Sequence, residues 1–470
     1  MATFGAAETD AEAPSASKPV TDADNSFVAF TVSSPAGKSN HSHPPHHKSV
    51  KPMRIVRKKI LPALLLLFPA MVCVAGAADA PQGAKSGAMS RAAVRRQIQA
   101  LDALGARLFR DPSLSASGKL ACASCHDPAH GFGPANALPV QMGGADMKQP
   151  GRRAVPSLTY LQATPPFTEH YFESEDDGDE SIDNGPTGGL TWDGRVDRGR
   201  EQARIPLLSE YEMANKDAAE VARRLEQAGY AASLRRILGA RLAGPDELFD
   251  AAAEALEVYE QNWRVFYPYS SKYDAYLAGK AELSPAEARG LALFEDPEKG
   301  NCANCHISQP SSNGAPPQFT DDGLIAIGVP RNRAIPANAD PRHFDLGLCG
   351  PDRTDFRDRA EYCGLFKTPS LRNVTLRQTF MHNGAFHSLR EVMEFYVQRD
   401  TDPGKWYGRK PDGTVDKYDD LPAVYHDNVN TDPPFDRKPG QAPALDAQEI
   451  DDVIAFLGTL TDGYKVPKRP

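Results

Sequence analysis

The chain has 470 residues, of which 40% are hydrophobic and 24% are charged, a balance typical of soluble chains that fold into two or three packed domains. Its formal net charge of −9 argues against a nucleic-acid partner and is compatible with docking to a basic redox protein. The 40 proline and 37 glycine residues predict long irregular connections between regular elements.

The N-terminal part of the chain divides into two segments. Residues 1–52 are polar, rich in Ala, Ser, Pro and His and without apolar periodicity, so we expect disorder there. Residues 53–77 resemble a secretory signal peptide, with basic residues after Met53, an apolar run and a small-residue cleavage site. We therefore expect Met53 to be the initiator and the mature protein to be periplasmic, in a bacterium. Contact with the membrane would require the signal to be retained as an anchor.

Two copies of the pentad C-x-x-C-H follow, at residues 122–126 and 302–306. This pattern is the attachment signature of c-type haem: the thiols bond to the haem vinyl groups and the histidine becomes the axial ligand of the iron. A structural zinc site or a thioredoxin-like C-x-x-C are the alternatives. We predict two covalently bound c-type haems, haem 1 at the first pentad and haem 2 at the second. The residues expected to hold them are Cys122, Cys125, His126, Cys302, Cys305 and His306.

The approach to each pentad is repeated. Residues 105–112 (GARLFRDP) align with residues 290–297 (GLALFEDP), and each segment ends a pattern with helical spacing of apolar residues. We therefore expect a mainly α fold of two cytochrome-c-like helical domains with long irregular loops. The N-terminal haem domain is expected at residues 90–270 and the C-terminal haem domain at residues 271–465.

Further helical patterns cover residues 91–109, 216–238, 245–267, 284–296 and 446–460. The stretch 400–443 is rich in Pro, Asp and Gly with little periodicity, so it is expected to be a long surface loop. Two of the seven cysteines, Cys349 and Cys363, belong neither to the pentads nor to the signal segment. An oxidising compartment favours a disulfide between them, and two free thiols are the alternative.

Several further motifs, in order along the chain, resemble those of the bacterial di-haem cytochrome c peroxidase superfamily, which includes the di-haem enzyme that matures tryptophan tryptophylquinone. The resemblance covers about residues 93–460. It implies a peroxidatic haem in the N-terminal half and an electron-transfer haem in the C-terminal half. The motifs are LFRDP at 108–112, WDGR at 192–195, EQA at 201–203, EMA at 212–214, FKTPSLRNV at 366–374 and FMHNG at 380–384.

The resemblance also implies roles for single residues. Glu212 matches the catalytic acid–base residue of the family, and Gln202 and Pro206 match residues over the distal face of haem 1. Trp192 matches a tryptophan between the two haems, and Met381 matches an axial methionine of haem 2, where the quinone-maturing relative has a tyrosine. From the residues alone, a solvated Glu212, a core Trp192 and a core Met381 are the alternatives.

Two departures from the family pattern concern haem 1 and calcium. Residues 137–156 contain no histidine that could close haem 1, so we predict a haem 1 that is open at rest, with Met142 as a cap being the competing idea. Arg153 stands where relatives have an asparagine ligand of an inter-haem calcium ion, which leaves calcium as an open question.

Three functions are compatible with these residues. We favour a peroxidase that reduces hydrogen peroxide to water with electrons from a small cytochrome or cupredoxin, which enter through haem 2. The second is an oxidase that stores oxidising equivalents on the two haems and oxidises aromatic residues of a partner protein. The third is a pure electron carrier, which would need neither Glu212 nor a vacant iron.

Overall fold

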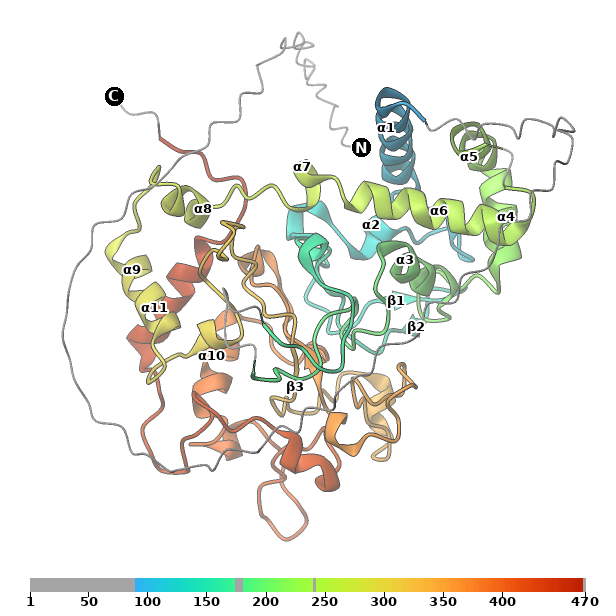
Figure 1. Ribbon diagram of the computed structural model, residues 1–470. Coiled ribbons are helices and arrows are strands. Elements are labelled where there is room, and N and C mark those ends of the chain that lie inside the picture. The colour runs from blue at the N-terminus through green and yellow to red at the C-terminus, as the bar shows by residue number, and fades with distance from the viewer. Residues whose placement is uncertain (1–88, 174–180, 240–241, 468–470) are drawn as a thin grey trace, which may run out of the picture. The chain divides into compact units, whose positions relative to one another are not determined.

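The structure is a computed structural model that describes residues 89–173, 181–239 and 242–467 (Figure 1). The expected disordered segment 1–52 and signal peptide 53–77 lie outside the described residues. Within those ranges the chain is mainly helical with little sheet, and none of its helices is long and apolar enough to cross a membrane. The helices are α1 (Arg91–Leu108), α2 (Cys122–Cys125), α3 (Gly199–Leu208), α4 (Ala218–Gln227), α5 (Tyr230–Leu238), α6 (Pro245–Glu260), α7 (Trp263–Phe266), α8 (Lys272–Leu277), α9 (Pro285–Glu295), α10 (Leu389–Gln398) and α11 (Ala447–Gly458).

The sheet structure in the described ranges consists of two antiparallel pairs of two-residue strands. Strand β1 (Met142–Gly143) pairs with β2 (Gln149–Pro150), and β3 (Leu324–Ile325) pairs with β4 (Phe366–Lys367). The remaining connections are irregular or short 3-10 turns, as the proline and glycine content predicts.

The sequence repeat is also a structural repeat. Helix α1 packs on α6 and α9 packs on α11, and in each pair a glycine of the first helix lies against the backbone of the second. A Cβ atom on Gly105 would lie 1.9 Å from the carbonyl oxygen of Ala255, and a Cβ atom on Gly290 would lie 1.9 Å from that of Asp452. Only glycine permits this approach of two helix backbones, which explains why both copies of the repeat begin with it.

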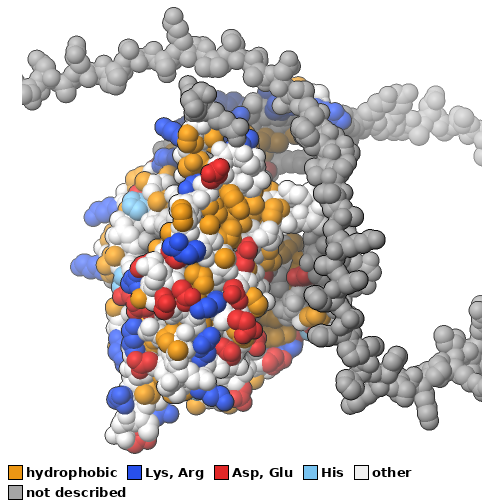
Figure 2. All heavy atoms as spheres, turned by 90° about the vertical axis from the view of Figure 1, so that its left-hand side faces the viewer, with side chains coloured by type: hydrophobic (Ala, Val, Ile, Leu, Met, Phe, Trp, Pro, Cys, Tyr) orange, Lys and Arg blue, Asp and Glu red, His pale blue; other side chains and the backbone are white. Residues whose placement is uncertain are grey.

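Each half of the chain has its own hydrophobic core. The N-terminal core is made of buried residues between Leu101 and Phe266, and the C-terminal core of buried residues between Tyr273 and Leu460. The expected domain boundary at residue 270 falls between the two cores, which belong to one compact unit. Figure 2 shows the face over α9 and α11, where acidic, basic and hydrophobic side chains are interspersed.

Three expectations need correction. The helical pattern over 216–238 is divided into α4 and α5 by Gly229, whose φ of +78° cannot continue a helix. The pattern over 245–267 is divided into α6 and α7. The stretch 400–443 is not simply a surface loop, because Tyr407 and Tyr418 are buried in the C-terminal core. Their irregular spacing gives no periodic signal in the sequence.

The two cysteines outside the pentads, Cys349 and Cys363, form a disulfide with an S–S distance of 2.03 Å. Both are buried in the C-terminal core.

Candidate active site

The histidines of the two pentads are held in the same way. The Nδ1 atom of His126 lies 2.9 Å from the carbonyl oxygen of Phe132, and that of His306 lies 2.9 Å from the carbonyl oxygen of Phe319. Because a carbonyl only accepts, Nδ1 carries the proton and Nε2 keeps its lone pair. Burial lowers the pKa of both imidazoles to about 4. Both rings are therefore neutral, and each offers Nε2 to a metal ion.

The four cysteines of the pentads are not disulfide-bonded. Each pentad folds into one tight turn, in which the backbone N–H of the histidine donates to the carbonyl of the first cysteine at 2.9 Å in the first copy and 2.8 Å in the second. Burial raises the pKa of each thiol to about 12, so all four remain protonated. These thiols are available for thioether bonds.

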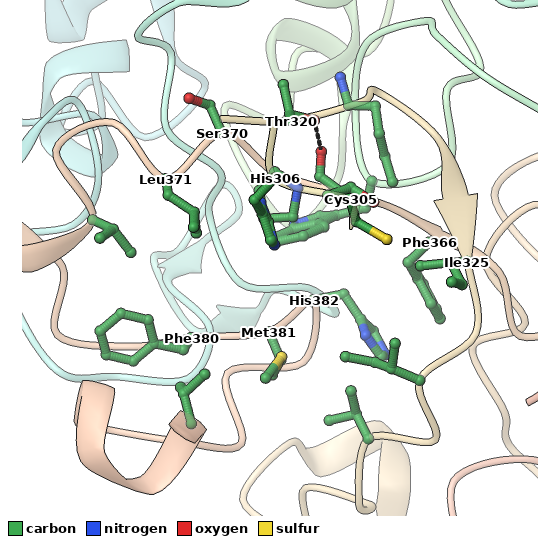
Figure 3. Close-up of a pocket in the computed structure, with 18 of the residues that line it drawn as sticks. Cys305, His306, Thr320, Ile325, Phe366, Ser370, Leu371, Phe380, Met381 and His382 are labelled. Atoms are coloured by element: carbon green, nitrogen blue, oxygen red, sulfur yellow. Dashed lines mark hydrogen bonds between the residues drawn. The ribbon is translucent and has the colours of Figure 1, made fainter. Parts of the chain in front are cut away.

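A cavity of about 280 Å³ lies beside the second pentad. Figure 3 shows the imidazole of His306 on one side of it and the side chain of Met381 on the opposite side. The adjacent His382 stacks on Phe366, with ring centroids 3.5 Å apart and an angle of 10° between the ring planes. Burial lowers the pKa of His382 to about 4. The thioether of Met381 thus faces His306 across the cavity, and His382 packs beside it.

Arg377 gives an independent indication of what this cavity holds. Its Nη2 donates to the carbonyl of Val155 at 2.8 Å, while its Nη1 is buried without a hydrogen-bond partner among the described residues. Burial lowers the pKa of the guanidinium to about 10. A buried cation without a counter-ion is costly, and the propionate groups of a haem are anions that would pair with it. The thiols, the imidazoles and this guanidinium together fit haem.

Glu212 lies in the turn that follows α3. Its backbone N–H donates to Ser209 at 3.0 Å, and its carbonyl accepts from Gly144 at 2.8 Å. Burial raises the pKa of the Glu212 carboxyl above its usual range, although a hydrogen bond from Ser209 and the charge of Arg195 oppose the shift. The pKa of Cys125 is raised by burial and then by the charge of Glu212, so the carboxylate lies near the first pentad.

Gln202 and Pro206 lie one helical turn apart on α3, so they share one face of that helix. Gln202 lines the same cavity as Trp192, His306 and Met381. Pro206 does not line this cavity. Its carbonyl accepts a hydrogen bond from the backbone N–H of Met213 at 3.0 Å, and this bond closes the turn that contains Glu212.

Trp192 is bonded to both halves of the chain. Its indole Nε1 donates to the carbonyl of Ala154 at 2.8 Å, and its own carbonyl accepts from the backbone N–H of Lys367 at 2.8 Å. The side chain is half-buried and lines the cavity beside the second pentad.

Met142 does not face Glu212. A Cβ atom on its neighbour Gly143 would lie 2.2 Å from the carbonyl oxygen of Tyr211 and 2.9 Å from the Cα of Glu212, so that side of β1 packs against the Glu212 turn. Successive residues of a strand point to opposite sides, and Met142 is accordingly 41% exposed. The geometry disfavours Met142 as a cap on haem 1.

Arg153 is buried in a cluster of carboxylates. Its Nη1 donates to Asp193 at 2.7 Å, and its Nε and Nη2 donate to Asp345 at 2.6 and 2.7 Å. A guanidinium thus provides positive charge where the family pattern has a calcium ligand. Among the described residues, no group of three or more His, Cys, Asp or Glu side chains is arranged to hold a metal ion.

Comparison with known proteins identifies the family. The family model of the di-haem cytochrome c peroxidases matches residues 99–282. Methylamine utilization protein MauG of Paracoccus denitrificans is 35% identical over 375 residues, which cover 77% of this chain and 89% of that protein. The chain belongs to the di-haem cytochrome c peroxidase family. It is therefore an oxidoreductase, from a family of di-haem proteins.

Other relatives in this di-haem family carry different names. Cytochrome-c peroxidase IdrP1 of a Pseudomonas species (strain SCT) is 29% identical over 311 residues, covering 63% of this chain and 71% of that protein. The crystal structure of the diheme peroxidase BthA from Burkholderia thailandensis has a TM-score of 0.66 and 41% identity, covering 77% of this chain and 86% of that chain.

Sequence reasoning missed Arg377, Asp345 and His382 as members of the site. Arg377 meets Val155 across 222 residues of sequence, and Arg153 meets Asp345 across 192. Neither pair lies within a local motif. His382 directly follows Met381 in the motif FMHNG, so its position next to a predicted ligand could have indicated that it belongs to the site.

Proposed function

We propose that the protein is a periplasmic di-haem peroxidase that reduces hydrogen peroxide to two water molecules, with two electrons from a small cytochrome or cupredoxin. One observation carries the proposal. A half-buried carboxyl group with a raised pKa, Glu212, lies near the first pentad, whereas the sulfur-bearing side chain of Met381 faces the histidine of the second. The first site is suited to proton transfer and the second to electron transfer.

The pentads would hold the two haems through their cysteines; His126 would bind the iron of haem 1, and His306 and Met381 would bind the iron of haem 2. When bound, the haems supply two iron atoms that change oxidation state and, at haem 1, a coordination position for peroxide. Glu212 takes the proton from one peroxide oxygen and delivers it to the other oxygen, which leaves as water. Gln202, one turn before Pro206 on α3, is assigned to orienting the peroxide because the resemblance places it over haem 1; it also lines the cavity that contains Trp192 and Met381.

Trp192 is proposed to relay electrons between the two sites. The indole donates to Ala154 in the N-terminal half, and the backbone carbonyl of Trp192 accepts from Lys367 in the C-terminal half, so the residue is held by both halves. A fixed aromatic ring shortens the gap that an electron must cross. On the C-terminal side, Ile307 follows His306 and is 40% exposed, so the second pentad borders the molecular surface, and we propose that the donor docks there.

Arg377→Met is expected to lower the midpoint potential of at least one haem. Removing a buried positive charge stabilises the oxidised form of a nearby haem, and a tenfold change in the reduction equilibrium corresponds to about 59 mV for one electron. Spectroelectrochemical titration of the purified holoprotein measures the effect. Arg377→Lys keeps the charge and is the control. Equal potentials in wild type and Arg377→Met would contradict the pairing of Arg377 with a haem propionate.

A second candidate function is supported by the similarity to MauG, which extends over 89% of that protein. In this reading the protein oxidises aromatic side chains of a partner protein. At the position where the quinone-maturing relative has a tyrosine ligand, this chain has Met381, as family peroxidases do. This difference favours the peroxidase.

Steady-state kinetics test the two functions. The holoprotein is mixed with hydrogen peroxide and a reduced small cytochrome c or cupredoxin, and we expect two donor molecules to be oxidised for each peroxide consumed. Failure to consume peroxide with any reduced donor would overturn the peroxidase. Mass spectrometry of co-purified or candidate partner proteins after peroxide addition detects side-chain oxidation, which would support the second function.

A further inference from the structure

Two loops of the chain have the same backbone fold. We call residues 190–196 the tryptophan loop and residues 380–386 the methionine loop. Each is closed by an antiparallel bridge between its first and last residues, and the second residue of each has a positive φ, +74° at Thr191 and +68° at Met381. The bridged pairs are Leu190 with Val196 and Phe380 with Phe386.

The agreement continues through both loops and into the helices that follow. The fifth residue of each loop is a glycine with positive φ, +63° at Gly194 and +61° at Gly384. The tryptophan loop leads into α3 and the methionine loop into α10, and a glutamate caps each helix start. Glu201 accepts from the N-cap backbone N–H at 3.1 Å, and Glu391 does so at 3.0 Å.

The third residues of the loops make reciprocal hydrogen bonds to the opposite half of the chain. Lys367 donates its backbone N–H to the carbonyl of Trp192 at 2.8 Å, and Ala154 donates to the carbonyl of His382 at 2.7 Å. Lys367 and Ala154 each lie two residues before a Pro-Ser-Leu sequence. An approximate internal symmetry therefore relates the two halves: it exchanges Trp192 with His382 and Lys367 with Ala154.

The same exchange relates the two histidine sites. The serine of each Pro-Ser-Leu sequence donates to a carbonyl at 2.6 Å, Ser157 to Gly131 and Ser370 to Gln318. Gly131 and Gln318 each directly precede the phenylalanine whose carbonyl holds the pentad histidine. The relation that maps the first histidine onto the second thus also maps the tryptophan loop onto the methionine loop.

We propose that Thr191 occupies the position toward haem 1 that Met381 occupies toward haem 2. This inference rests on the proposed function and deepens it. It explains why haem 1 has a free coordination position: the residue at position 191 is a threonine and not a methionine. Thr191 cannot act as the thioether does: its side chain is short, and its hydroxyl donates to Asp193 at 2.6 Å. A neutral hydroxyl is also a poor ligand for haem iron.

The backbone at Thr191 supports this assignment. A β-branched residue at φ +74° is in an uncommon and unfavourable conformation, which persists only where the surrounding structure fixes it. The loop therefore keeps the backbone that places a ligand at Met381, although it carries no ligand side chain. In the second half, methionine already adopts this backbone conformation, with φ +68° at Met381. The backbone of the tryptophan loop is therefore compatible with a methionine at position 191, and that of the methionine loop with a threonine at position 381.

Thr191→Met in the holoprotein tests the proposal. We expect the absorption and EPR signals of oxidised haem 1 to change from high-spin to six-coordinate low-spin, with the haem 2 signals unchanged. Cyanide binding to haem 1 is expected to weaken at least tenfold. Thr191→Ser, which keeps the hydroxyl, is the control and should retain the wild-type spectrum.

The reciprocal variant, Met381→Thr, gives a test that remains valid if Thr191→Met does not fold. We expect it to open haem 2, which should become high-spin and bind cyanide. Unchanged spin states at haem 1 in a folded Thr191→Met protein, or at haem 2 in Met381→Thr, would overturn the proposal. A wild-type protein with both haems low-spin and inert to peroxide would instead overturn the proposed function, so the two failures are distinguishable.

Discussion

Glu212→Gln is expected to bind both haems yet to reduce hydrogen peroxide about 100-fold or more slowly, because a positioned proton-transfer group contributes roughly 10² to 10⁴ in rate. Glutamine has nearly the same shape and can still donate and accept hydrogen bonds at this position. It cannot take a proton from one peroxide oxygen and return it to the other. Steady-state turnover with a reduced donor measures the loss, and the absorption spectrum reports haem content.

Glu210→Gln is the matched control, because Glu210 lies two residues away and is exposed. It should behave as wild type. A Glu212→Gln protein with wild-type turnover would rule out Glu212 as the proton-transfer residue.

The pH dependence of peroxide reduction gives a second signature of Glu212. The carboxyl must be ionised to accept a proton, so the rate falls as the pH drops through its pKa. Burial raises this pKa above the ordinary value of 4.5. The acid limb of kcat/KM is therefore expected at a higher pH than an ordinary glutamate would give, and it should be absent from the residual activity of Glu212→Gln.

The parts of the fold that the sequence predicts are those with local signals. The start of α9 is an example. Ser284 accepts from the backbone N–H of Glu287 at 3.3 Å, and Glu287 accepts from that of Ser284 at 2.6 Å, which is the capping box that the residues indicate. Pro285 occupies the first helical position. All of these interactions lie within four consecutive residues, so they can be predicted from the sequence without knowledge of the tertiary structure.

The relation between the tryptophan and methionine loops could not be predicted in this way. Their sequences, LTWDGRV and FMHNGAF, share only the glycine. The backbone requires a residue that tolerates positive φ at that position, a closing bridge and a capped helix, and these requirements leave the other side chains free to diverge. The contacts of Arg377 and Arg153 could not be predicted from the sequence either, because their partners lie in distant parts of the chain.

Gly290→Ala is expected to destabilise the holoprotein by about 3 kcal/mol, at the upper end of the usual cost of overpacking. The new Cβ would lie 1.9 Å from the carbonyl oxygen of Asp452 and 2.9 Å from the Cβ of Phe456. The nearer of these atoms belongs to the backbone of α11, so relief requires α9 and α11 to separate. This cost exceeds the gain of up to about 1 kcal/mol that alanine brings to a helix interior.

Thermal unfolding of the holoprotein measures the effect of Gly290→Ala. A loss of about 3 kcal/mol should lower the Tm by roughly 6 to 12 °C for a cooperative unit of about 200 residues. Gly458→Ala is the matched control: it adds the same methyl group to α11, at a position where the new Cβ meets nothing within 4 Å outside the neighbouring backbone of its own helix. It should leave the Tm unchanged or raise it slightly. Equal Tm values for the two variants would show that the α9–α11 crossing tolerates a side chain, and the repeat of Gly105 and Gly290 would then need a different physical cause.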